Sequence, residues 1–320
     1  MVDALTLRRL GDTGLEVTGL ALGCSPLGSD PGAYGYVVEE ARAIETVKAM
    51  LASPLNFLDT AAIYGHGESE RRVGDALRQA GDVSPNLVIA TKADRDPNTG
   101  RFDGPQVRRS VAGSLERLGV GHLQLVHLHD PEYALSFEEA MKPHGPVDAL
   151  VELRAEGVIS YIGVAAGPVG LLTQFVATGA FDVVLTHNRF TLIDQSAQPL
   201  LDAAMKHSVA VVNAAPYGSG VLAKGSRGHP RYGYRQLDED LVHRIDRLTG
   251  LCEANDVPLA AAALQFSLRE PRIASTVVGM TRPERVAQTI ALASHPIPDA
   301  LWEELLTVAL PTTDPRVDAW

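Results

Sequence analysis

Four side chains that can hold or move a proton follow three short apolar runs of the sequence. Asp59 lies near the end of LNFLDT with Tyr64 five residues beyond it, Lys92 ends NLVIATK, and His129 ends LQLVHLH. The tyrosine phenol has an ordinary pKa of about 10, far above neutrality. A neighbouring Lys92 favours the phenolate, and Asp59 is the obvious partner to hold that ammonium. Tyr64 could then exchange a proton with a carbonyl or alcohol oxygen, to which His129 donates a second hydrogen bond.

Each of these residues also has a plainer interpretation. Asp59 and Lys92 could form only a structural salt bridge at the ends of two strands. Tyr64 taken alone would be a half-buried loop tyrosine. His127 is more simply a hydrogen-bonded histidine of the core, and His66 a solvated loop residue.

The sequence lacks the patterns of two other kinds of catalysis. No nucleophile is flanked by a base in a recognised elbow, and no cluster has metal-ligand spacing, so we expect no metal. Cys24 and Cys252 belong to no CxxC pair, which indicates neither a disulfide framework nor a zinc site. Proton transfer without a nucleophile or a metal favours hydride chemistry with a bound nicotinamide.

Eight short apolar runs alternate with longer amphipathic segments along the chain. The runs predict strands over residues 19–24, 55–60, 86–92, 123–129, 158–165, 181–187, 209–215 and 274–280. The amphipathic segments predict helices over 39–52, 68–80, 104–119, 146–157, 167–179, 196–208 and 282–294. This alternation predicts an α/β fold, a single (β/α)8 TIM barrel in one domain over residues 1–320. In such a barrel the carboxyl ends of all strands meet on one face, where enzymes of this architecture build their sites.

Three segments fall outside the plain repeat. LTLRRLGDTGLEV, residues 5–17, predicts a β-hairpin that closes the barrel floor. Residues 216–238 are rich in Gly, Tyr and Arg and predict a long loop above the barrel. Residues 295–320 form an additional C-terminal segment.

Composition limits the classes of partner. The chain has 320 residues, 45% hydrophobic and 21% charged, which is typical of a soluble globular protein. A net charge of −11 argues against general binding of nucleic acid. No signal peptide and no run of about twenty apolar residues is evident. We therefore expect a cytoplasmic protein, a monomer or small homo-oligomer, that acts on a small molecule and engages no membrane.

Several longer motifs resemble those of the aldo-keto reductases. They are RRLGDTGLEVTGLALGC, NFLDTAAIYGHGESERRVGDAL, VIATK, LGVGHLQLVHLHDPE and VVGMTRPERV, which together span roughly residues 5–292. The resemblance implies that Asp59, Tyr64, Lys92 and His129 form a catalytic tetrad with Tyr64 as general acid or base. Counting from Leu118 places His129, and not His127, at the family's histidine.

The resemblance also implies NADP or NAD as cofactor, with the preference left open. In the loop after the last strand, Gly279 replaces a lysine that would meet a 2′-phosphate, whereas Arg285 matches the family's arginine. The Ser-Asn pair that holds the nicotinamide carboxamide is replaced by Ala165 and Ala166, and the stacking tyrosine by Ala214. The residues expected to contact the cofactor are Gly23, Cys24, Asp59, His187, Ala215, Pro216, Tyr217, Ser219, Val221, Gly279, Met280, Thr281, Arg285, Gln288 and Thr289.

NAAPYGSGVLA and HNRFTLIDQ are similar to a subgroup that oxidises aldoses at the anomeric carbon, the D-threo-aldose, L-fucose and galactose 1-dehydrogenases. The resemblance thus implies oxidation of a sugar to a lactone. Alternatives are an NADPH-dependent reductase of small aldehydes and ketones, or a sensor subunit that only binds nicotinamide. The expected substrate contacts are Tyr64, His66, His129 and Asn188, with further polar groups from Arg231, Tyr232, Tyr234 and Arg235.

Overall fold

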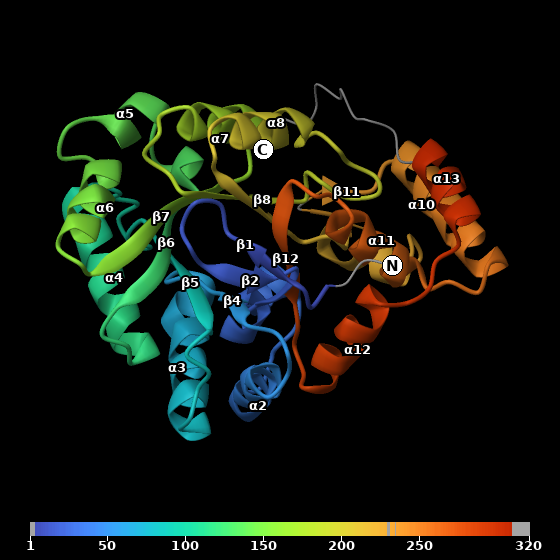
Figure 1. Ribbon diagram of the computed structural model, residues 1–320, viewed down its shortest axis with the longest axis horizontal. Coiled ribbons are helices and arrows are strands. Elements are labelled where there is room, and N and C mark those ends of the chain that lie inside the picture. Colours follow the sequence, from blue (N-terminus) through green and yellow to red (C-terminus); the bar gives the residue numbers. More distant parts are fainter. Residues whose placement is uncertain (1–3, 229–230, 234, 309–320) are drawn as a thin grey trace.

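A closed barrel of eight parallel strands forms the centre of the protein. It is seen in the computed structural model, which describes residues 4–228, 231–233 and 235–308 (Figure 1). The last barrel strand, β12, pairs with both β9 and the first, β3, which closes the ring. All eight predicted strands are confirmed. In chain order they are β3 (Leu20–Gly23), β4 (Phe57–Asp59), β5 (Val88–Ala93), β6 (Leu123–His129), β7 (Ile159–Ala166), β8 (Val183–His187), β9 (Ala210–Ala214) and β12 (Ile273–Gly279).

The predicted hairpin is present at the amino ends of the barrel strands. β1 (Leu7–Arg9) and β2 (Glu16–Thr18) pair antiparallel. Leu10 and Val17 of this hairpin pack among the inward-facing barrel residues. The hydroxyl of Tyr161, near the start of β7, donates a hydrogen bond to the carbonyl of Thr13. The hairpin therefore covers the floor and leaves the opposite end, the barrel mouth, for the polar strand ends.

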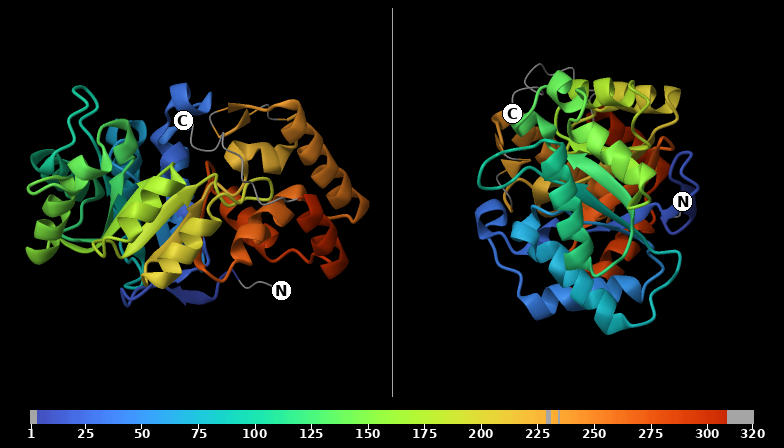
Figure 2. Two further views of the ribbon diagram at one scale, coloured as in Figure 1. Left: turned by 90° about the horizontal axis from the view of Figure 1, so that it is seen from above. Right: turned by 90° about the vertical axis from the view of Figure 1, so that its left-hand side faces the viewer.

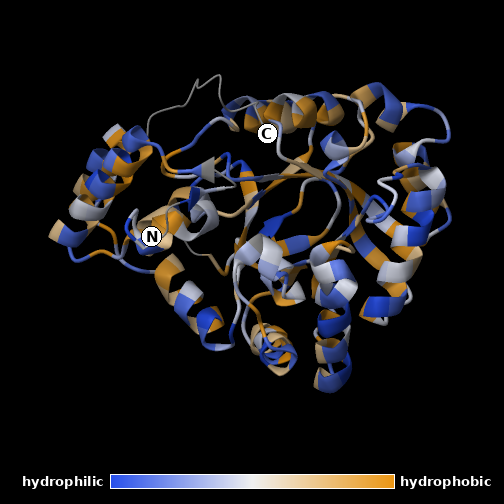
Figure 3. Cartoon of the chain, turned by 180° about the vertical axis from the view of Figure 1, so that it is seen from behind, coloured by the Kyte–Doolittle hydropathy of each residue, from blue (hydrophilic) through white to orange (hydrophobic). Residues whose placement is uncertain are grey.

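The seven predicted helices are present around the barrel. They are α2 (Glu40–Leu51), α3 (Glu68–Ala80), α4 (Gly104–Leu118), α6 (Pro146–Ala155), α7 (Val169–Val176), α8 (Gln198–Lys206) and α12 (Glu284–Ala293). Figure 3 shows hydrophobic and hydrophilic residues alternating along them. This is the pattern expected of helices with one face on a sheet.

Two helices between β9 and β12 were not predicted from the sequence. These are α10 (Glu239–Ala254) and α11 (Leu259–Leu268). Eight of the ten residues of α11 are buried, so its sequence LAAAALQFSL lacks the alternation that reveals an amphipathic helix. In the C-terminal segment, α13 (Asp299–Val308) packs beside α10 at one end of the molecule (Figure 2).

The segment after β9 has more structure than the predicted long loop. It contains the short helices η4 (Gly218–Gly220) and α9 (Val221–Lys224), followed by the paired strands β10 (Arg231–Tyr232) and β11 (Arg235–Gln236). The other short helices are η1 (Ser25–Gly28), α1 (Pro31–Tyr34), η2 (Tyr64–Gly67), η3 (Pro131–Tyr133) and α5 (Phe137–Met141). No helix in the described ranges is long and apolar enough to cross a bilayer.

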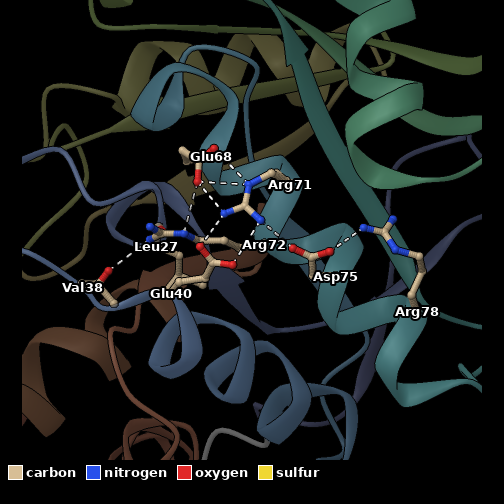
Figure 4. Close-up of polar contacts among 8 residues, drawn as sticks. All are labelled: Leu27, Val38, Glu40, Glu68, Arg71, Arg72, Asp75 and Arg78. Carbon is tan, nitrogen blue, oxygen red and sulfur yellow. Dashed lines mark hydrogen bonds and ion pairs between the residues drawn. The ribbon is translucent and has the colours of Figure 1, made fainter.

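An ion-pair network along α3 joins it to α2 (Figure 4). The guanidinium of Arg71 lies 2.7 Å from carboxylate oxygens of Glu40 and Glu68 and 2.8 Å from Asp75. These groups are partly solvent-exposed, so each pair contributes little to the free energy of unfolding by itself. Their shared arginine nevertheless fixes the start of α3 relative to α2.

The neighbouring Arg72 points the other way, into the protein. Its buried guanidinium donates hydrogen bonds to the carbonyls of Leu27 and Val38 (Figure 4). Those two carbonyls lie on either side of the segment that follows β3. Arg72 therefore ties both ends of this segment to α3, the helix that directly follows Tyr64.

Candidate active site

Asp59 and Lys92 form an ion pair inside the barrel mouth. They lie on the adjacent parallel strands β4 and β5. Lys92 Nζ is 2.7 Å from Asp59 Oδ1 and donates a second hydrogen bond, also 2.7 Å long, to the carbonyl of Thr60. Lys92 is only 1% exposed and Asp59 4%. An ammonium buried this deeply requires a partner, because removing a charge from water is costly unless it is paired.

Tyr64 lies against this pair, held by an unusual turn. It begins η2, where Gly65 has φ +59° and packs so tightly that a Cβ there would lie 2.1 Å from the carbonyl oxygen of Gly28. Lys92 Nζ is 4.7 Å from the centre of the Tyr64 ring. On another side the His129 ring meets it edge-on, with centroids 5.6 Å apart. The structure thus brings all four predicted residues together.

Burial acts on the pKa of Tyr64 in the direction opposite to the effect expected of Lys92. Loss of water around the phenol, and secondarily the carboxylate of Asp59, raise the pKa of Tyr64 well above its ordinary value. Desolvation disfavours the charged form and outweighs any help from the ammonium of Lys92. The resting form of Tyr64 is therefore the neutral phenol, the form that donates a proton.

His129 is held by a carboxylate that the sequence analysis did not identify. Its Nδ1 lies 2.6 Å from Oδ1 of Asp94, and its Nε2 lies 3.7 Å from Oδ2 of Asp130. Desolvation lowers the pKa of His129, but the carboxylates of Asp130 and Asp94 outweigh it and raise the pKa above its ordinary value. Strand alternation could have identified Asp94, because it lies two residues after Lys92 and so falls on the same side of the strand.

His127 lies one layer deeper, as strand alternation predicts, while Leu128 points outward into the core between strands and helices. The His127 ring packs directly on Gly163, where a Cβ would lie 2.1 Å from Nδ1. Burial lowers the pKa of His127 well below its ordinary value, and Lys92 lowers it further. The backbone of Val164 lies close enough to His127 to raise this pKa slightly, although neither ring nitrogen has a well-formed hydrogen bond among the described residues. The ring is a neutral, buried histidine of the core.

The expected substrate contacts separate into two kinds. His66 is exposed on the turn after Tyr64. Asn188 is buried, its Nδ2 lies 3.2 Å from His187 Nδ1, and its Oδ1 has no partner in the described part of the chain.

The polar loop residues expected near the substrate have other positions. Tyr232 is buried, and its hydroxyl donates a hydrogen bond to the carbonyl of Asn188, so it supports the rim and does not face a substrate. Arg231 is exposed, nothing is described of the Arg235 side chain, and Tyr234 lies outside the described residues.

The candidate cofactor residues at the ends of β3 and β12 differ in exposure. Gly23 and Gly279 are paired neighbours. Gly279 is exposed, whereas Cys24 and Met280 have 0% and 1% of their surface exposed. Burial, with a smaller effect of Asp59, raises the pKa of Cys24 well above its ordinary value, so this thiol stays neutral.

After β9, the chain folds into a tight turn beside the mouth. Gly218 and Ser219 both have positive φ, and Ser219 is exposed. Tyr217 is half-buried, yet its hydroxyl is buried and has no hydrogen-bond partner within the described ranges. Pro216 and Val221 are buried, and Ala215 is half-buried.

Arg285 provides a cation next to this turn. It is exposed in the first turn of α12 and lies close enough to Tyr217 to act on its pKa, which burial raises and Arg285 lowers. Gln288 is exposed on the same helix, and Thr281 is half-buried before it. Thr289 is buried, and its hydroxyl donates to the carbonyl of Arg285. Arg285 and Gln288 are thus the exposed polar groups at the start of α12, beside the buried hydroxyl of Tyr217.

Ala165 and Ala166 offer no polar side chain at the end of β7. Ala165 faces the barrel interior and Ala166 the outer core. Polar groups nearby include Glu132, whose Oε1 accepts a 2.8 Å hydrogen bond from the N–H of Gly167. On the next strand, His187 ends β8, and Asn188 follows it with a positive φ of 57°.

The barrel and its hairpin floor are those of one enzyme family. The model of the aldo/keto reductase family matches residues 20–308, and the chain belongs to that family. It is accordingly an oxidoreductase that uses NAD(P).

The curated relatives include three dehydrogenases. D-threo-aldose 1-dehydrogenase of Pseudomonas sp is 32% identical over 93% of this chain and 95% of its own length. Pyridoxal 4-dehydrogenase of Microbacterium luteolum is 31% identical over 95% and 97%. L-galactose dehydrogenase of Arabidopsis thaliana is 30% identical over 91% and 89%. All three names specify dehydrogenation, and two of them specify a sugar.

A solved aldo-keto reductase from Bacillus halodurans, in its holo form, has the same fold. It superposes with a TM-score of 0.76, covers 98% of this chain and 99% of its own, and is 24% identical in sequence. This likeness concerns the fold alone.

Proposed function

We propose that the protein oxidises the anomeric carbon of an aldose to the lactone, with NAD(P) as hydride acceptor. The observation that carries the chemistry is the contact of one phenol, Tyr64, with both a buried ammonium and an imidazole. The sugar is supported by the relatives that act, by name, on D-threo-aldoses and L-galactose.

Tyr64 is the residue that we propose to exchange the proton of the substrate oxygen. Lys92 lies against its ring and favours the phenolate, the form that takes up the substrate proton and becomes the phenol, while Asp59 holds the ammonium in place. His129 meets the same oxygen and sets its orientation. A bound nicotinamide would supply hydride chemistry beside this group. Arg285, Gln288 and Tyr217 are the residues that would hold its nucleotide, and Asn188 its carboxamide.

A second candidate direction is the reduction of small aldehydes or ketones. It is favoured by the raised pKa of Tyr64, because a neutral phenol is the form that donates a proton. A family member that only binds nicotinamide as a sensor would keep the same fold and cofactor surface without turnover.

These candidates are separated by following absorbance at 340 nm. The oxidation panel is L-fucose, D-arabinose, L-galactose and pyridoxal with NAD⁺ or NADP⁺, and the reduction panel is simple aldehydes with NADH or NADPH. The aldose proposal requires faster oxidation of at least one sugar than reduction of any aldehyde, and a lactone as product. Turnover of aldehydes alone would identify a reductase. Binding of nicotinamide without any turnover would identify a sensor.

The role of Tyr64 is tested by Tyr64→Phe, matched with Tyr161→Phe. Both variants remove one phenol hydroxyl, but Tyr161 lies on the barrel floor. We expect Tyr64→Phe to lose at least about 100-fold in kcat, the lower range for a general acid or base. Tyr161→Phe should keep wild-type turnover. Equal activity of the two variants would exclude Tyr64 from proton transfer.

A further inference from the structure

We propose that Asp94 is a positioning residue: its carboxylate holds a proton on Nδ1 of His129, so that Nε2 donates a hydrogen bond to the substrate only when the imidazole is charged. The substrate side of this proposal rests on the proposed function. Its structural side concerns His129 alone and can be tested without a substrate.

The Asp94 carboxylate connects the two residues that would meet the substrate oxygen. Its Oδ1 lies 2.6 Å from His129 Nδ1. Its Oδ2 accepts a 2.9 Å hydrogen bond from the backbone N–H of Ile63, the residue directly before Tyr64. One carboxylate therefore sets the positions of an imidazole on β6 and of the turn that carries the phenol.

Asp94 is itself held firmly from the other side. Its backbone N–H donates to Ser110 Oγ at 3.0 Å, and its carbonyl accepts from Gln106 Nε2 at 3.1 Å. Both partners lie on α4, whose first turn is capped by the side chain of Asp103. Asp94 is 4% exposed. A group fixed in this way can dictate the state of its neighbour, because it has no room to adjust.

The position of the shared proton follows from the two basicities. A carboxylate has an ordinary pKa of about 3.9 and an imidazole of about 6.5, so the proton between them stays on the ring. The ionised carboxylate can only accept hydrogen bonds, and Asp94 already accepts one from Ile63. Neutral His129 must then carry its proton on Nδ1 and present a bare Nε2 at the mouth.

The two charge states of His129 suit opposite directions of the reaction. A bare Nε2 accepts a hydrogen bond from an alcohol, the substrate of oxidation. Its lone pair is repelled by the lone pairs of a carbonyl oxygen, the substrate of reduction. The charged ring donates from Nε2 and suits the carbonyl of reduction. The other titratable groups that face His129 also affect its protonation. They are Asp130, Glu132, Lys92, Tyr64, His127 and His187.

The proton position is measured by ¹⁵N NMR of the histidine side chains, with His129 assigned by its absence in His129→Gln. In the wild type we expect Nδ1 to appear protonated at every pH, and Nε2 to lose its proton as the pH rises. In Asp94→Asn the side chain has one acceptor and one donor. Its oxygen is expected to stay with Ile63 N–H, so its NH₂ faces Nδ1 and the proton of the neutral ring moves to Nε2.

Asp96→Asn is the matched control. Asp96 lies two residues further along the same segment and is half-buried, and its Oδ1 accepts hydrogen bonds from the backbone N–H groups of Asn98 and Thr99. We expect the ¹⁵N signals of His129 in Asp96→Asn to match those of the wild type. A wild-type spectrum with the neutral-ring proton on Nε2 would overturn the proposal, and so would an Asp94→Asn spectrum with that proton still on Nδ1. If Asp94→Asn fails to fold, the wild-type spectrum alone tests the proposal, because it shows which nitrogen of neutral His129 carries the proton.

The kinetic counterpart is the pH profile of carbonyl reduction. We expect kcat/KM of the wild type to fall tenfold per pH unit above the titration of His129, and Asp94→Asn to be flat over that range with a lower kcat. If Asp94 were merely structural, Asp94→Asn would have the same pH profile as the wild type, with kcat/KM lowered by the same factor at every pH. That outcome would contradict the proposal. Failure of every substrate would reject the proposed function and leave the NMR result standing.

Discussion

The carbonyl oxygen of Gly28 occupies the position where a side chain at residue 65 would begin. Gly65 also has a positive φ, which glycine adopts at little cost. The turn that places Tyr64 therefore depends on two glycines from different loops packed against each other.

Gly65→Ala should displace Tyr64 as well as destabilise the fold. We expect at least about 3 kcal/mol lower free energy of unfolding, since backbone must move to admit the Cβ, and a loss of turnover. Gly14→Ala is the control, because Gly14 has a positive φ but nothing within 4 Å of a Cβ. It should cost about 1 to 2 kcal/mol and leave turnover intact. Urea unfolding and the 340 nm assay measure both. Equal effects of the two substitutions would show that the contact with Gly28 is unimportant.

Lys92→Met should destabilise the protein more than a surface ion-pair variant would. It leaves the Asp59 carboxylate buried without its cation, which costs about 3 to 5 kcal/mol. The double variant Lys92→Met/Asp59→Leu removes both charges and should recover most of this loss in urea unfolding. Neither variant should turn over a substrate. A double variant that recovers no stability would contradict the charge-based explanation.

His127 should make the protein sensitive to mild acid. Its pKa is lowered in the folded state, so its contribution to stability is complete above the unfolded-state pKa of about 6.5 and is lost as the pH falls below it. One such group costs about 1.4 kcal/mol per pH unit in the window between the two pKa values. His127→Leu removes this dependence, whereas the exposed His207→Gln should retain it. The measurement is the slope of unfolding free energy between pH 5 and 7.5, and equal slopes would contradict the prediction.

Arg285→Ala should weaken NADPH binding roughly tenfold and NADH binding much less, because only NADPH carries the 2′-phosphate that a guanidinium would pair with. Arg247→Ala, an exposed arginine on α10, is the control and should change neither. Titration of nicotinamide fluorescence gives both dissociation constants. An equal loss for the two cofactors would place Arg285 away from the 2′-phosphate.

The barrel was predictable because its strands are covered on both sides and therefore appear as uninterrupted apolar runs. Helices with one solvent-exposed face, such as α3 and α4, were predictable because their apolar and polar residues alternate at helical spacing. α11 was missed because a helix buried on nearly all sides has no polar stripe.

The four mouth residues could be predicted since they follow strands that must end on one face. Asp94 was missed because it lies just beyond the end of the predicted strand, although strand alternation places it on the same side as Lys92. The sequence displays the cation of Lys92, which favours the phenolate of Tyr64, but not the loss of water around the phenol, which raises its pKa.

Arg72 has a consequence for how the protein can change. It binds the carbonyls of Leu27 and Val38, so the chain between them, which presents Tyr34 and Tyr36 at the surface, is anchored at both ends and unconstrained by this arginine in the middle. Such a segment is an exchangeable cassette. Because Arg72 holds only its two ends, we expect changes in the middle of the segment to leave the turn of Tyr64 in place, and Tyr34, which acts on the pKa of Tyr64, is the position from which the segment can reach the site.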